Sequence, residues 1–206
     1  VLDVTDPRAF DATNAAALVV LDRTDPVGMD RDIGHVTSAP VTEAGDPSLS
    51  RQIARMNNGR WALVTGNGYN SADERAVLLI QFLDQARELL KIATEGGQAA
   101  GRGNGLSAPR LVDLDGNGTP DLAYAGDLHG NLWKFDLGAA TSGGWKVDFG
   151  GMPLFVATSP GSSASRQPIT TAPVWKAHPD GGLMLAFGSG RALTAADRVE
   201  IGRAHV

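Results

Sequence analysis

The sequence contains no cysteine, no long apolar run and no excess of basic residues. The absence of cysteine among 206 residues excludes disulfides, thiol catalysis and cysteine-ligated zinc, and it is compatible with either a reducing or an oxidising compartment. No apolar run reaches the roughly 20 residues that a helix needs to span a bilayer. The net charge of −5 provides no basic field that would hold nucleic acid through counterion release. We therefore expect neither a nucleic-acid partner nor a transmembrane segment.

What the chain does have is the composition of a folded protein, with 42% hydrophobic and 20% charged residues. It opens on Val1 rather than methionine, so the sequence says nothing about a signal peptide. The last six residues, IGRAHV at 201–206, read like translated sequencing adapter, and we expect a non-native tail there. The expected domain therefore covers residues 1–200.

A repeat organises most of the chain. Three related tetrapeptides recur at intervals of 69 (107 − 38) and 64 (171 − 107) residues: SAPV at 38–41, SAPR at 107–110 and TAPV at 171–174. Each is followed by a six-residue run that ends in glycine: WALVTG at 61–66, DLAYAG at 121–126 and LMLAFG at 183–188. The break before each run contains Asn-Gly or Asp-Gly, which is typical of a β-hairpin when it separates apolar runs. Each repeat is therefore expected to contain a hairpin.

The length and content of this repeat match a propeller blade. Further strand-like runs follow the glycine, for example NLWKFDL at 131–137, so each unit holds about four short strands. Three units are visible, the last incomplete, whereas propellers close with roughly four to eight blades. The prediction is an all-β fold: a partial β-propeller of about three blades from a larger, quinoprotein-like propeller.

One segment, residues 74–94, carries a conflicting pattern. Its apolar residues recur at the spacing of an amphipathic helix, and its composition favours a helix. The repeat requires instead a strand at 76–82, a turn near 84–86 and a strand at 89–93, although neither glycine nor proline supports that turn. We expect the hairpin, because tertiary context often overrides local propensity, with the helix as the alternative.

The segment DLDGNGTPD at 113–121 has the ligand pattern of a calcium loop. Five residues offer oxygen ligands at loop positions 1, 3, 5, 7 and 9: Asp113, Asp115, Asn117, Thr119 through its backbone carbonyl, and Asp121. Gly118 occupies position 6, where the chain must turn sharply, but Tyr124 stands where an EF-hand has its glutamate. Oxygen ligands on a flexible loop favour calcium over transition metals and over magnesium. We predict one Ca²⁺ in a loop grafted onto a hairpin; the alternative is a polar turn.

Other candidate residues favour structural roles. GNG at 66–68 and GSG at 188–190 lack the lysine and helix of a phosphate loop, and the histidines at 35, 129 and 178 lack zinc-ligand spacing. Asp127 is expected to tie strands together rather than to face a ligand. Four tryptophans are expected to pack between blades rather than to stack on a sugar: Trp61, Trp133, Trp145 and Trp175.

Several segments together resemble the C-terminal propeller of the PilY-type tip-associated proteins of type IV pili. They are VLDVTDP, GRWALVTGNGYNS, VDLDGNGTPDLAYAGDLHGNLWKFDL, QPITTAPVWKAHPDGG and LAFGSGRAL. The resemblance runs from Val1 to about Arg198 and is most specific at residues 112–137. It implies a secreted adhesin at the pilus tip that attaches through minor pilins and adheres to host or abiotic surfaces. It also implies a calcium loop whose occupancy biases pilus extension against retraction, and hence twitching motility and surface attachment.

The calcium ligands that the resemblance implies fall on the same five residues, Asp113, Asp115, Asn117, Thr119 by its carbonyl, and Asp121. Loops of this family often carry aspartate where Asn117 stands, which implies a lower affinity here. The region of the family that carries much of its adhesive variation is not part of this sequence, so adhesive specificity is left open.

The expected function is therefore non-enzymatic, a calcium-dependent pilus adhesin that regulates motility. The alternative is a pyrroloquinoline quinone-dependent quinoprotein dehydrogenase, in which calcium holds the quinone at the propeller centre beside an aspartate base. The single contiguous loop, without a second acidic cluster, favours the adhesin. A third hypothesis is that calcium only stabilises the fold.

Overall fold

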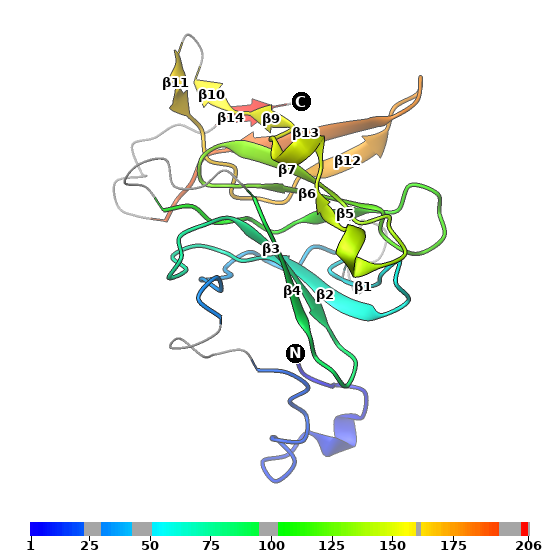
Figure 1. The fold of residues 1–206 in the computed structure, drawn as a ribbon. Helices are drawn as coiled ribbons and strands as arrows, with labels where there is room; N and C mark the ends of the chain where they lie inside the picture. Colours follow the sequence, from blue (N-terminus) through cyan, green and yellow to red (C-terminus); the bar gives the residue numbers. More distant parts are fainter. Residues whose placement is uncertain (23–29, 43–50, 95–102, 160–161, 194–202, 206) are drawn as a thin grey trace. The chain divides into compact units, whose positions relative to one another are not determined.

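The computed structural model describes residues 1–22, 30–42, 51–94, 103–159, 162–193 and 203–205 (Figure 1). The chain divides into two units, Val1–Arg31 and Asp32–Val206. The first unit contains a short 3₁₀ helix, η1 (Pro7–Ala9), and an isolated β-bridge between Leu2 and Val19. No helix among the described residues is both long and apolar enough to cross a membrane.

The second unit begins with a sheet of four strands in the order β1-β2-β3-β4, labelled in Figure 1. Each strand pairs antiparallel with its neighbour in sequence, which is the meander of a propeller blade. The strands are β1 (Ile53–Arg55), β2 (Trp61–Gly66), β3 (Val77–Phe82) and β4 (Leu89–Ala93).

The next sheet repeats this order with one addition. Its strands are β5 (Arg110–Val112), β6 (Leu122–Gly126), β7 (Asn131–Asp136), β8 (Lys146–Val147) and β9 (Phe155–Val156). β8 pairs with the C-terminal end of β7 and β9 pairs with its N-terminal end. Two 3₁₀ turns, η2 (Ser142–Gly144) and η3 (Phe149–Gly151), flank β8.

A third sheet has the order β12-β13-β14, and a separate two-stranded ribbon precedes it. The strands are β12 (Val174–Ala177), β13 (Leu183–Ser189) and β14 (Arg203–His205), and the ribbon consists of β10 (Thr158–Ser159) and β11 (Ser162–Arg166). β14 lies within the segment expected to be a non-native tail, and it pairs with residues 187–189 of β13.

The all-β prediction is confirmed, and the repeat marks equivalent strands. The three runs ending in glycine correspond to β2, β6 and β13, which are the second strands of the three sheets. The predicted hairpin at 74–94 is also confirmed, as β3 and β4, so the alternative of a helix is wrong. Its turn forms without glycine or proline because Arg87 itself adopts a positive φ of 45° and donates its amide to the Asp84 carbonyl.

The glycine that ends the run has a packing role in the first two repeats. A Cβ atom on Gly66 would lie 2.0 Å from the carbonyl oxygen of Ser107, and one on Gly126 would lie 2.2 Å from the side chain of Ile169. In both cases the chain that approaches the glycine leads into the next repeat. Glycine is therefore required there because no side chain fits between the second strand of one sheet and the segment that enters the next.

The residue after each of these glycines is a buried hydrogen-bonding centre. The Asn67 side chain accepts the backbone amides of Val77 and Leu106 at 3.1 and 2.9 Å. The Asp127 carboxylate is fully buried and accepts the Trp133 indole N–H at 2.8 Å, together with side-chain amides of Asn104 and Asn131. The structural role predicted for Asp127 is therefore confirmed.

A hydrophobic core joins the first and second sheets. Its largest fully buried side chains include Phe82 and Leu78 of β3 and Trp133 and Phe135 of β7. Trp133 and Trp145 are 1% and 6% exposed, as the packing prediction requires. Trp61, which begins β2 on the face away from the core, is 56% exposed, and Trp175 on β12 is 37% exposed, so neither is buried between the sheets described here.

Candidate metal centre

The loop predicted to bind calcium connects β5 to β6. Its base is closed by the Asp121 amide, which donates to the Val112 carbonyl at 2.9 Å. Gly116 and Gly118 have φ values of +76° and +87°, and a Cβ atom on either would meet nothing within 4 Å. The glycines are therefore needed for backbone conformation rather than for space, since L-residues rarely adopt positive φ. The Asp-Gly-Asn-Gly sequence bends this connection around its own side chains.

The structure brings three of the predicted ligand residues together. One carboxylate oxygen from each of Asp113, Asp115 and Asp121 lies within 4.8 Å of the other two. Among the described residues, these three form the acidic cluster whose oxygens are close enough together to hold a metal ion. Asp113 and Asp121 are half-buried, whereas Asp115 is exposed. Three negative charges at this spacing repel one another, and a divalent cation between them removes the repulsion.

Backbone amides of the loop hold these carboxylates in place. Asp113 accepts the amides of Gly116 and Gly118 at 2.8 and 2.7 Å. Asp121 accepts the Leu114 amide at 2.8 Å. Hydrogen bonds to charged acceptors are stronger than those between neutral groups, so these amides fix the orientation of the carboxylates. Each carboxylate has about four lone pairs, so some remain available to a metal ion.

The other two predicted ligand residues bond to each other. The Asn117 side-chain oxygen accepts the Thr119 amide at 2.8 Å, and the Thr119 hydroxyl lies 2.5 Å from it. The Asn117 side-chain amide group donates to Asp115 at 2.9 Å. The Asn117 oxygen is therefore directed at Thr119 in this conformation, and it would have to rotate to join the three carboxylates.

One residue that contacts this loop was not anticipated from the sequence. Asn57, in the turn between β1 and β2, donates its side-chain amide to the carbonyls of Pro120 and Leu137 at 3.0 and 3.1 Å. The same group lies 3.4 Å from the Asp121 carboxylate. Asn57 is separated from the loop residues that it contacts by more than 60 positions in sequence, so only the first Asn-Gly break, NNGR, hinted at it.

The donor chemistry of the loop fits calcium. All the candidate ligands are oxygens, three of them are carboxylates, and the positive-φ glycines let the loop wrap around an ion. The histidines at 35, 129 and 178 are not part of this cluster. Nitrogen and sulfur donors of the kind that select zinc or copper are absent from the cluster.

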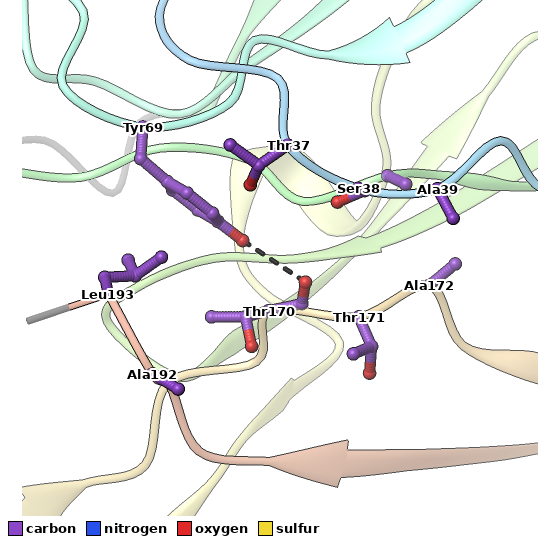
Figure 2. A pocket seen from close by; sticks show the side chains of 10 residues that line it. Thr37, Ser38, Ala39, Tyr69, Thr170, Thr171, Ala172, Ala192 and Leu193 are labelled. Carbon is purple, nitrogen blue, oxygen red and sulfur yellow. Dashed lines mark hydrogen bonds between the residues drawn. The ribbon is translucent and has the colours of Figure 1, made fainter. Parts of the chain in front are cut away.

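The three repeated tetrapeptides meet at a different feature, a pocket with a volume of about 370 Å³ (Figure 2). It is lined by Thr37, Ser38, Ala39, Tyr69, Ala108, Thr170, Thr171, Ala172, Ala192 and Leu193, none of which is charged. The Tyr69 hydroxyl donates to the Thr170 carbonyl at 3.3 Å across it. Burial, with the negative charge of Asp127, raises the pKa of Tyr69 to about 12, so this hydroxyl stays neutral.

Comparison with known proteins gives a family match over most of the chain. Residues 9–206 match the family described as the PilY1 beta-propeller domain. The type IV pilus biogenesis factor PilY1 of Pseudomonas aeruginosa is 38% identical over 91% of this chain and 17% of its own length. A PilY1 homolog of Xylella fastidiosa is 35% identical over 95% of this chain and 13% of its own length. The chain thus spans less than a fifth of these relatives.

A solved structure agrees with the fold. The crystal structure of the Pseudomonas aeruginosa PilY1 C-terminal domain matches with a TM-score of 0.68 and 36% identity, covering 82% of this chain and 35% of that chain. Together with the family match, this confirms the predicted β-propeller fold and the predicted resemblance.

Proposed function

The chain belongs to the PilY1 β-propeller domain family, and from this premise we propose that it is the calcium-binding propeller of an extracellular adhesin at the tip of a type IV pilus. The observation that carries the proposal is the cluster of three carboxylates on the loop between β5 and β6. Relatives named as type IV pilus biogenesis factors support the association with pili.

Five residues would hold the ion: Asp113, Asp115, Asn117, Thr119 through its carbonyl, and Asp121. Calcium would supply positive charge that neutralises the carboxylates. The residues of the chain do the rest: the Gly116 and Gly118 amides orient Asp113, and the Leu114 amide orients Asp121. A loop held in this way is rigid when loaded and is weakened by carboxylate repulsion when empty.

The proposed consequence is regulatory. The loop is mostly exposed, so a change in its order alters a surface that minor pilins of the pilus tip would contact. Occupancy of the site then biases pilus extension against retraction, and with it twitching motility and attachment to host or abiotic surfaces. The domain proposed to do this is residues 1–200, with 201–206 as a non-native tail.

The proposal includes that the propeller is not an enzyme. A quinoprotein dehydrogenase binds pyrroloquinoline quinone at its propeller centre. This quinone itself carries three carboxylates, so its binding site needs cationic side chains. The described side chains that line the pocket where the three repeats meet are all uncharged. Reconstitution with pyrroloquinoline quinone tests this directly, and a bound-quinone absorbance would favour the enzyme.

Calorimetric titration with calcium tests the binding step. Asp113→Ala and Asp121→Ala should each abolish or strongly weaken binding, because each removes a clustered carboxylate, whereas Asp180→Ala on the exposed β12–β13 turn should not. Equal binding by all variants would overturn the proposed site. In cells, twitching by a folded Asp113→Ala variant that equals wild type would leave calcium with a structural role alone.

A further inference from the structure

We propose that Asn57 is a positioning residue for the metal loop of the neighbouring sheet, and that it couples ion binding to the order of its own turn between β1 and β2. This inference rests on the proposed calcium site and deepens it. It assigns to the first sheet a part in a site whose candidate ligands all belong to the second.

The hydrogen-bonding groups of the Asn57 side chain are directed at the loop and its flank. Its amide group has two hydrogens and three acceptors within reach, so the carbonyls of Pro120 and Leu137, at 3.0 and 3.1 Å, take the better bonds and the Asp121 carboxylate, at 3.4 Å, takes a longer one. Its oxygen accepts from the Thr119 hydroxyl at 2.8 Å. Aspartate could not donate to the carbonyls, and alanine could make none of these bonds.

These contacts fall on the half of the loop that carries loop positions 7 and 9. Thr119 and Asp121 lie there, and the Asp121 backbone is bonded to both Val112 and Leu137. The first half of the loop is held differently, by its own amides around Asp113. Asn57 therefore orients the second half of the loop, as the loop amides orient Asp113 in the first half. Outer-shell partners of this kind orient metal ligands and strengthen binding.

The turn that carries Asn57 is itself firmly held. The Met56 amide donates to the Arg60 carbonyl at 2.8 Å, and the Gly59 amide to the Met56 carbonyl at 2.8 Å. The Arg60 guanidinium pairs with Asp84 and Glu88 in the β3–β4 turn and lies 3.6 Å from the centre of the Phe82 ring. Because the turn is anchored to its own sheet, the bonds of Asn57 join two sheets. Coupling between sites is reciprocal, so an ion that orders residues 119–121 also orders residues 56–60.

Hydrogen exchange and calorimetry on the whole chain test this coupling, with Asn58→Ala as the matched control. The Asn58 side chain accepts the Arg60 amide within the turn, at 3.1 Å, and is adjacent to Asn57. In wild type and in Asn58→Ala, saturating calcium should slow amide exchange at residues 56–60. In Asn57→Ala this calcium-dependent protection should disappear and calcium affinity should fall about tenfold.

A second variant guards against misfolding of the first. Thr119→Val keeps the backbone carbonyl and removes the hydroxyl, which lies 2.8 Å from the Asn57 side-chain oxygen and 2.5 Å from that of Asn117; the loss of the Asn57 contact should weaken calcium binding by roughly two- to threefold. If the wild type binds calcium and Asn57→Ala shows the same affinity and the same calcium-dependent protection from exchange, the inference is overturned but the proposed calcium site is not. Absence of calcium binding in the wild type would overturn the proposed function as well as the inference.

Discussion

Replacing Asp115 by asparagine should have opposite effects on calcium affinity and on the stability of the calcium-free protein. Calcium lies about 2.4 Å from a ligating oxygen, and at the dielectric constant of water a full charge there contributes about 3.5 kcal/mol of attraction. Salt screening reduces this attraction, and the side-chain oxygen of the new asparagine still faces the ion, so the loss of binding free energy is smaller than the full value. We therefore expect calcium binding to weaken by about 1.5–3 kcal/mol, which is roughly tenfold to a hundredfold in Kd.

The calcium-free protein should gain from the same substitution. Asp115 has two carboxylate neighbours within 4.8 Å, and each pair of charges at that distance repels by about 0.9 kcal/mol in water. Salt roughly halves the total of about 1.7 kcal/mol. Asparagine still accepts the Asn117 backbone amide, which lies 3.0 Å from the Asp115 carboxylate in the wild type, whereas the Asn117 side-chain amide loses its exposed bond to Asp115 and turns to solvent. The melting temperature in chelator should therefore rise by about 2–4 °C.

The assay is thermal unfolding of both proteins in chelator and in calcium at a hundred times the wild-type Kd. Calcium should stabilise the wild type by about 2.7 kcal/mol but a variant with thirtyfold weaker binding by only about 0.9 kcal/mol. The two melting temperatures should then cross: the variant melts higher in chelator and lower in calcium. Asp180→Asn, which removes one exposed charge outside the cluster, should not cross. A variant that melts lower in both conditions, or binds calcium as wild type does, would refute the electrostatic account.

Two further predictions concern buried acids outside the loop. Asp127→Ala leaves the indole of Trp133 and its other donors without their acceptor, so it should destabilise the fold by about 3 kcal/mol and lower the melting temperature by about 6–12 °C; a shift under about 2 °C would contradict this. The hydrogen bond from Arg75, and to a smaller extent that from Lys91, holds the pKa of Asp32 below its ordinary value of 3.8. The stabilisation from these bonds is therefore present above pH 3.8 and is lost as the pH falls through the lower pKa of the folded state. Asp32→Asn should therefore flatten the loss of stability below pH 4 in urea unfolding, and parallel acid limbs would show that other groups dominate.

The sheets were predictable because glycine and the Asn-Gly or Asp-Gly breaks mark them locally. The one ambiguous segment, 74–94, shows why periodicity alone failed. All six residues of β3 are buried, so the strand has no polar face and its sequence does not alternate. A continuous apolar run of this kind fits a helix as well as a strand, and the repeat was what distinguished them.

The loop was predictable for the same reason, since its three carboxylates lie within nine residues of one another. The support around it was not predictable. Asn57 reaches Pro120 across 63 positions, and Asn67 reaches Leu106 across 39, and a single sequence does not show which segments meet at such separations. Nor does spacing give rotamers, which is why the Asn117 oxygen is found bonded to Thr119 instead of facing the carboxylates.

The pairing of β8 and β9 with opposite ends of β7 also bears on self-association of the protein. β8 covers residues 135 and 136 of β7, and β9 covers residues 131 and 132, so two short segments replace one long outer strand. A continuous strand edge offers its amides and carbonyls to any other extended chain and is a template for aggregation. The stretch of β7 left between them is two residues, too short to recruit a foreign strand.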